Sequence, residues 1–169
     1  QPFQTVPLVA VQAERRLTLL LVDDEETVRR ATAAMLRDLP SPPLLVVDGV
    51  HGLGATDETV ATMGADYFCA GTHKWMFAPR GTGLVWANAA NWARLQPLVP
   101  NFTELESYKA WAEDRPPSDP ANAARMTPGG FKAFEHVWAL AEAFQFMQQV
   151  GKPNVEARTR QLAGRLVLR

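Results

Sequence analysis

Short apolar runs bounded by turn residues are the main pattern in the middle of this chain. Residues 44–48 (LLVVD) are rich in branched side chains and stop at Asp-Gly, which is typical of a buried parallel strand. Residues 65–71 (ADYFCAG) predict the next strand. The intervening TDETVATMG predicts one short helix, because it offers a threonine or aspartate cap and a glycine stop. We therefore expect one strand–helix–strand unit here.

Segments on either side extend this pattern. Residues 81–87 (GTGLVWA) follow a Pro-Arg-Gly-Thr turn and predict a strand that returns antiparallel. Nearer the amino end, the apolar run LTLLLV precedes TVRRATAAMLRDL, which has helical periodicity and is stopped by PSPP. The expected fold class is α/β, with a mixed, mostly parallel sheet and helices on both faces.

The carboxyl-terminal part of the chain differs in composition. Residues 101–128 are polar and contain prolines, and EDRPPSDPANAA within them predicts a surface loop. GFKAFEHVWALAEAFQFMQQVG predicts a helix that ends at Gly151 and Pro153, and NVEARTRQLAGRLVLR predicts the start of another amphipathic helix. Apolar residues at helical spacing in the first of these helices are expected to contact the core or another subunit: Phe131, Phe134, Val137 or Trp138, Ala141, and Phe144 or Phe146.

Two candidate functional residues follow the predicted strands. Asp48 ends the first strand and Lys74 follows the second, so both are expected at the carboxyl edge of the sheet, where ligands bind in α/β folds. Pyridoxal phosphate requires such a pair. A carboxylate keeps its ring nitrogen protonated, and a lysine amine holds its aldehyde as a Schiff base. The pair therefore predicts a site for this cofactor.

Three stretches support this interpretation by resemblance: VVDGVHGLG, ADYFCAGTHKWMFAPRGTGLVW and RMTPGGFKAFEHVWALAEAF. In this order they resemble the class V aminotransferase superfamily of fold type I pyridoxal-phosphate enzymes, and within it the isopenicillin N epimerase-like branch. The resemblance implies that residues 44–150 form the cofactor-binding core of the large domain. Residues 1–43 then form a strand–helix segment before that core, and residues 151–169 begin a further helix.

The resemblance also implies roles for individual residues. Asp48 pairs with the pyridinium nitrogen, and Lys74 forms the Schiff base of the resting enzyme, the internal aldimine. His51 falls where relatives place a glutamine or histidine that hydrogen-bonds the phenolic oxygen of the cofactor. His73, immediately before the lysine, matches a ligand of the cofactor phosphate.

Two threonines complete the implied site. Thr127 in MTPGGF corresponds to a threonine that binds the cofactor phosphate of the neighbouring subunit, which implies a homodimer with shared active sites. Thr72 is a further candidate phosphate contact. Here the chain departs from the cysteine desulfurases of the superfamily, which have a serine where Gly71 stands. No metal site is expected.

The same residues also have ordinary structural interpretations. A lysine and a histidine in a loop are usually solvated, and Asp48 with Gly49 alone would form a common turn after a strand. His51 alone would more often be a satisfied polar residue than a ligand. Cys69 lies in an apolar strand, which favours buried packing over nucleophilic chemistry.

Composition agrees with an enzyme but does not select one. The 169 residues suffice for one domain with a sizeable core, and a formal net charge of −1 without a basic cluster gives no indication of a nucleic acid or a membrane surface as partner. The single cysteine excludes an internal disulfide and favours a cytoplasmic location. No apolar stretch reaches the length of about 18 residues that a membrane span requires, and we identify no export signal.

The length of the chain differs from that of the family. Full members are considerably longer. They carry a phosphate-binding loop and a ring-stacking side chain ahead of the position of Leu44, and a later domain whose arginine binds the substrate carboxylate. The chain is therefore expected to correspond to the middle of such an enzyme.

The expected function is that of a pyridoxal-phosphate-dependent enzyme acting on an amino acid. In an intact relative, Lys74 would act as a general base at the substrate α-carbon. Local resemblance favours an epimerase, and a lyase or an aminotransferase remains open. One alternative is a catalytically inactive interaction module that retains the dimer face.

A second alternative comes from the acidic cluster near the amino end. LTLLLVDDEETVRRATAAML resembles the opening of a two-component receiver domain, in which Asp23 and Asp24 would hold Mg²⁺. Asp48 follows after a single helix, which is earlier than a receiver places its phosphoacceptor. A solvated acidic cap on the following helix explains the cluster better, because negative charge stabilises a helix amino terminus.

Overall fold

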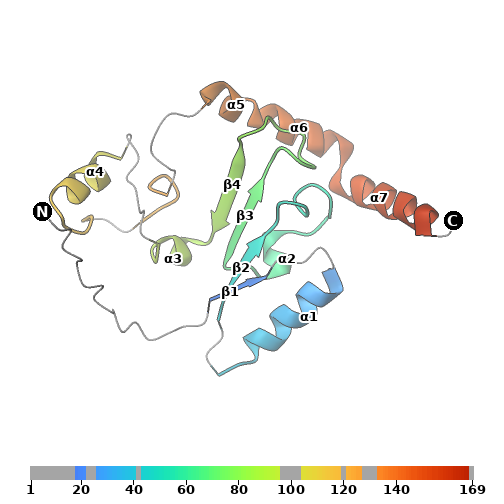
Figure 1. The fold of residues 1–169 in the computed structure, drawn as a ribbon, viewed down its shortest axis with the longest axis horizontal. Coiled ribbons are helices and arrows are strands. Elements are labelled where there is room, and N and C mark those ends of the chain that lie inside the picture. Colours follow the sequence, from blue (N-terminus) through green and yellow to red (C-terminus); the bar gives the residue numbers. More distant parts are fainter. Residues whose placement is uncertain are drawn as a thin grey trace, which may run out of the picture.

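The computed structural model describes residues 18–21, 26–40, 43–95, 104–118, 121–126 and 133–167. A four-stranded sheet in the order β1-β2-β3-β4 lies at the centre of this part of the chain (Figure 1). β1 pairs in parallel with β2 and β2 in parallel with β3, whereas β4 returns antiparallel to β3. The prediction of an α/β fold with a mixed sheet is confirmed. The strands are β1 (Thr18–Leu21), β2 (Leu44–Asp48), β3 (Tyr67–Gly71) and β4 (Gly83–Ala87).

Seven helices accompany the sheet within the described residues. They are α1 (Glu26–Arg37), α2 (Val60–Met63), α3 (Ala89–Trp92), α4 (Leu105–Ala112), α5 (Phe134–Trp138), α6 (Leu140–Val150) and α7 (Lys152–Val167). The pattern of the sequence did not indicate α3 or α4. The segments 113–118 and 121–126, from the predicted surface loop, contain neither helix nor strand. No helix among the described residues is long and apolar enough to span a membrane.

The short helix between β2 and β3 begins and ends as the sequence predicts. Thr59 is its N-cap, and the Thr59 and Thr62 side chains satisfy each other's backbone N–H groups in a capping box. Gly64 ends the helix in the left-handed conformation, with φ of 65°. These local signals explain why a one-turn helix is stable here and returns the chain to the amino end of β3.

One face of the sheet packs against α1 and α2. Its inward residues alternate along β2 and β3, as expected for strands whose side chains point to opposite faces in turn. The buried cluster joins α1 to the sheet, and partly buried residues of α2 and β4 extend it. The buried members are Ala33, Leu45, Val47, Ala65, Phe68 and Ala70, and the partly buried ones are Leu53, Val60, Met63, Leu84 and Trp86.

Polar contacts hold α3 near the opposite face. The Tyr67 hydroxyl donates to the Asn91 carbonyl at 2.9 Å. The side-chain amide of Asn91 donates to two acceptors of Asp66, the backbone oxygen at 3.2 Å and the carboxylate at 3.3 Å. Asn91 is itself buried, so these bonds satisfy a polar group that water does not reach.

The carboxyl-terminal helices differ in two ways from the prediction. The single helix expected before Gly151 is divided at Ala139 into α5 and α6, although Gly151 ends α6 as predicted, with φ of 81°. Of the two alternatives expected for its aromatic residues, the core of this chain is excluded for Phe134 and Trp138, which are exposed by 50% and 73%. Only the small Ala143 and the flexible Met147 are buried on α6. Their contact with another subunit stays a prediction. From α6, α7 leads away from the sheet to the carboxyl end (Figure 1).

Candidate active site at the carboxyl edge of the sheet

Asp48 lies at the carboxyl end of β2, beside β3. It is in register with Cys69, and the Gly49 N–H donates to the Cys69 carbonyl at 2.7 Å. The Asp48 carboxylate accepts a hydrogen bond from the Val50 N–H at 3.1 Å, which turns the chain sharply after the strand. The remaining lone pairs of the carboxylate face solvent, because Asp48 is exposed.

A groove opens on the Asp48 face of the sheet. Its volume is about 830 Å³, enough for an organic cofactor. Asp48, Val50 and Cys69 form one side of it, and Val85 on β4 and Trp92 on α3 line it further along. Sequence reasoning missed Val50, Val85 and Trp92. The alternation of side chains along β4 was the signal available for Val85, since residues that share a face follow every second position.

The pKa of the Cys69 thiol reports the electrostatics of this groove. Burial raises the pKa of Cys69 above its usual value, and the nearby negative charge of Asp48 raises it further. The negative charge of Asp48 therefore acts on Cys69, a residue that lines the groove. A cationic group placed here would be stabilised by the same charge.

Lys74 lies on the loop of residues 72–82, which joins β3 to β4. The last pair of the β3–β4 ladder is Gly71 with Gly83, and both line the groove. The loop therefore starts and ends at the groove. Lys74 itself is exposed and does not line the groove in this structure.

The loop that follows β2 packs against the loop that carries Lys74. A side-chain carbon added at Gly54 would lie 2.9 Å from the backbone of Trp75, so only glycine permits this approach. Met76, 3% exposed, anchors the Lys74 loop beneath the surface. Phe77 takes a left-handed conformation with φ of 56°, which costs a non-glycine residue about 1 to 3 kcal/mol.

Helices α5 and α6 contact the other end of the Lys74 loop. The His136 ring nitrogen lies 3.1 Å from the carbonyl oxygen of Arg80. The rings of Phe77 and Phe146 meet edge to face, with centroids 5.8 Å apart. The loop is thus held between the turn after β2 and the helices that follow later in the chain.

The two predicted histidine ligands have different surroundings. His73 and Val50 both approach Gly71, because a carbon added at Gly71 would meet the His73 ring at 3.0 Å and Val50 at 3.4 Å. His73 is therefore close to the groove, although it is exposed. His51 is exposed on the turn after Asp48 and is not among the residues that line the groove.

The two predicted threonine ligands remain predictions. Thr72 is completely buried, and its hydroxyl bonds to that of Thr82 within the loop. Thr127 lies outside the described residues, as do Asp23 and Asp24. The preceding Met126 lines the groove, so the segment that leads to Thr127 reaches the Asp48 face.

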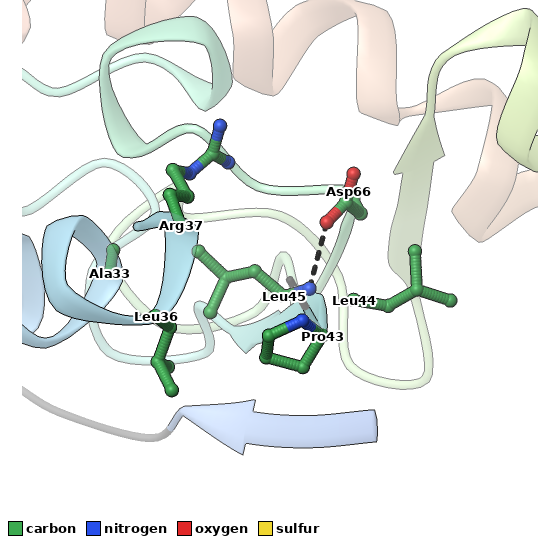
Figure 2. A pocket seen from close by; sticks show the side chains of 7 residues that line it. All are labelled: Ala33, Leu36, Arg37, Pro43, Leu44, Leu45 and Asp66. Carbon is green, nitrogen blue, oxygen red and sulfur yellow. Dashed lines mark hydrogen bonds between the residues drawn. The ribbon is translucent and has the colours of Figure 1, made fainter. Parts of the chain in front are cut away.

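A second cavity, of about 190 Å³, lies at the other end of β2 (Figure 2). Its residues are Ala33, Leu36, Arg37, Pro43, Leu44, Leu45 and Asp66. The Asp66 carboxylate is engaged there by the Leu45 N–H at 2.8 Å, drawn as the dashed line in Figure 2. Because Leu44 begins the strand that Asp48 ends, this cavity is separate from the candidate site.

The structure described above is an α/β domain with a groove at the carboxyl ends of its parallel strands. Comparison with known proteins agrees with this class of fold. The model of the family described as aminotransferase class-V matches residues 35–169. The chain belongs to this family, whose members are fold type I pyridoxal-phosphate enzymes. The matched residues include both Asp48 and Lys74, whereas Asp23 and Asp24, the metal pair of the receiver-domain alternative, precede the matched residues.

Individual relatives are more distant. Isopenicillin N epimerase of Streptomyces clavuligerus is 29% identical over 128 residues, covering 69% of this chain and 30% of that protein. The isopenicillin N epimerase of Amycolatopsis lactamdurans is 29% identical over 127 residues, covering 71% and 30%. The chain thus spans about 30% of the length of these relatives.

Solved structures share the fold. A cysteine desulfurase from Thermococcus onnurineus NA1 superposes with a TM-score of 0.60 at 17% identity, over 74% of this chain and 30% of that one. An alanine–glyoxylate aminotransferase from Nostoc sp. superposes with a TM-score of 0.54 at 19% identity, over 88% and 39%. The chain therefore matches part of the fold of these enzymes.

Proposed function

We propose that this chain supplies the cofactor-binding core of a pyridoxal-phosphate enzyme that acts on an amino acid. The observation that carries the proposal is that Asp48 lines the groove and that both ends of the Lys74 loop, at Gly71 and Gly83, line the same groove. The residues present fit the cofactor. Asp48 offers a carboxylate, Lys74 an exposed amine, and Val50 and Val85 an apolar surface for a flat ring.

Asp48 would hold the ring nitrogen of the cofactor in its protonated form. Its charge already raises the pKa of Cys69, and the same field would favour a proton on a neighbouring nitrogen. When bound, pyridoxal phosphate supplies an electron sink for bonds at the α-carbon of an amino acid. Asp48 would strengthen that property by keeping the ring positively charged.

Lys74 would bind the cofactor covalently and then transfer a proton. Its amine is exposed on a loop that borders the groove, and its flexible side chain would turn toward the groove to meet a bound aldehyde. As a neutral amine at the border of the groove, it would act as the general base that accepts the proton of the substrate α-carbon. His73 would contact the cofactor phosphate, and His51 its phenolic oxygen.

The substrate and the assembly are further parts of the proposal. The named relatives, both isopenicillin N epimerases, favour epimerase-like chemistry over lyase or aminotransferase chemistry. We expect a homodimer in which Thr127 contributes to the site of the partner. An inactive interaction module is the alternative, and the exposed Phe134 and Trp138 are the observation in its favour.

Covalent attachment of the cofactor tests the proposal. The purified chain is incubated with pyridoxal phosphate, desalted, reduced with borohydride and mapped by peptide mass spectrometry. Labelling of Lys74 is expected in the wild type and in Lys109→Arg, which changes an exposed lysine on α4. Lys74→Arg should abolish it while keeping the charge. Equal labelling of several exposed lysines, unchanged in Lys74→Arg, would contradict the proposal.

A further inference from the structure

Two buried threonines close the loop that carries Lys74. Thr72 directly follows Gly71 and Thr82 directly precedes Gly83, and these two glycines are the last pair of the β3–β4 ladder. Their exposures are 0% and 7%, and their hydroxyl oxygens are 2.5 Å apart. The Thr72 N–H also donates to the Thr82 carbonyl at 3.1 Å. Side chains and backbone therefore continue the pairing of the strands into the loop.

The direction of each hydroxyl bond follows from counting protons. A threonine hydroxyl has one proton to donate. The Thr82 hydroxyl donates its proton to the Pro79 carbonyl at 2.6 Å. The contact with Thr72 must then be a bond in which the Thr72 hydroxyl donates and the Thr82 oxygen accepts. The result is a chain of hydrogen bonds that runs from Thr72 through Thr82 to Pro79.

This chain of bonds defines a smaller loop around Lys74. The Ala78 N–H donates to the Thr72 carbonyl at 3.1 Å, which closes residues 72–78 into a ring. The adjacent Pro79 is the acceptor at the end of the hydroxyl chain. Both ends of the small loop are thus fixed by Thr72 and Thr82, whereas His73 and Lys74 within it are exposed.

We propose that Thr72 and Thr82 are positioning residues that fix the conformation of the 72–78 loop and so hold Lys74 at the border of the groove. The proposal rests on the proposed role of Lys74. It gives Thr72 a function different from the phosphate contact implied by family resemblance, because its one proton is committed to Thr82. Buried, fully paired hydroxyls restrict a loop more than exposed ones do, since breaking the bond leaves polar atoms without water.

Two measurements on the full 169-residue chain test this inference. The first is hydrogen exchange of peptides spanning residues 72–82 without cofactor. The second is the rate of labelling of Lys74 by pyridoxal phosphate and borohydride. Thr82→Val preserves the shape of the side chain and removes its hydroxyl. We expect it to accelerate exchange of the Thr72 and Ala78 N–H groups about tenfold and to slow labelling several-fold.

Two variants distinguish a positioning role of Thr82 from a general loss of stability. Thr82→Ser restores the hydroxyl and should recover wild-type exchange and labelling. Thr159→Val on α7 makes the same chemical change outside the loop and should alter neither. A generic acylating reagent should modify the exposed Lys74 equally in all variants, because it needs no particular loop conformation.

The outcomes distinguish this inference from the proposed function. If the wild type is labelled at Lys74 and Thr82→Val shows unchanged exchange and labelling, the positioning role is wrong and the proposed function stands. If the wild type is not labelled at Lys74, the proposed function fails, and exchange alone decides whether the threonines hold the loop. Failure of Thr82→Ser to recover either property would also overturn the inference.

Discussion

The Asp48 carboxylate and the Cys69 thiol lie in register on neighbouring parallel strands and share one wall of the groove. Asp48 is proposed to bind the cofactor, and the Cys69 thiol beside it can be titrated directly. Burial is the larger cause of the raised pKa of Cys69, and the charge of Asp48 is the smaller one. The thiol can therefore report the charge of Asp48 without any cofactor.

Asp48→Asn should lower the pKa of the Cys69 thiol without returning it to the ordinary value. The amide removes the negative charge that disfavours the thiolate and leaves the burial unchanged. At a pH below the pKa, the fraction of thiolate should rise, and alkylation should accelerate. The measurement is the rate of alkylation by iodoacetamide against pH. Asp57→Asn, at an exposed carboxylate in the following loop, is the control, and an equal change in both variants would contradict the coupling.

Asp66 is expected to contribute strongly to stability, although it lies far from the groove. Its carboxylate accepts from the Leu45 N–H at 2.8 Å and from the Asn91 amide at 3.3 Å, and so links β2, β3 and α3. Asp66→Ala leaves the Leu45 N–H without its acceptor and limits the Asn91 amide to the backbone oxygen of residue 66, at a cost of about 1 to 3 kcal/mol. Urea unfolding measures the loss. Asp38→Ala, an exposed site, should change the free energy of unfolding by less than about 0.5 kcal/mol, and similar losses in the two variants would exclude this role.

The Glu106 carboxylate links α4 to the loop that follows it and gives this region a dependence on pH. Hydrogen bonds from Arg115 and then from Ser118 lower the pKa of Glu106 from 4.5 to about 2. Because the folded pKa is lowered, the stabilisation is complete above about pH 4.5 and is lost as the pH falls through about 2. The effect is small, since solvent screens an exposed pair.

Glu106→Gln tests this dependence. Its difference in melting temperature from the wild type should be largest above about pH 4.5 and should vanish near pH 2. Glu135→Gln, an exposed residue on α5, should show no such trend. A difference that stays constant over this range would show that the carboxylate does not titrate as expected.

The sequence predicted the elements that depend on local signals. The β2–α2–β3 unit is specified by branched apolar runs, by the Thr59 cap and by the left-handed Gly64, all of which act within a few residues. The antiparallel return of β4 followed from the turn before it and the apolar run after it. Such features are predictable because the interactions that stabilise them join residues close together in the sequence.

Features set by distant contacts were not predictable in this way. The Thr72–Thr82 bond joins residues whose hydroxyls carry no pattern in the sequence, and α3 depends on Asp66 and Tyr67, far away along the chain. The apolar stripe of α5 correctly indicated a helix. Periodicity identifies an apolar face, but it does not say whether this chain or another surface covers that face.

Gly54 connects the turn after β2 to the Lys74 loop, and its substitution should disturb that loop. A methyl group at this position would lie 2.9 Å from the Trp75 backbone, and the φ of 86° is itself unfavourable for alanine. Gly54→Ala should therefore destabilise the fold by about 1 to 3 kcal/mol and accelerate hydrogen exchange around Trp75.

Gly164→Ala is the matched control for this substitution. Gly164 lies within α7, and an added carbon there meets nothing within 4 Å. Alanine favours a helix over glycine, so this variant should keep or increase stability by up to about 1 kcal/mol. If Gly54→Ala left both stability and exchange near Trp75 unchanged, the two loops would not be packed as described. Lys74 would then lack the support on which its proposed reach to the groove depends.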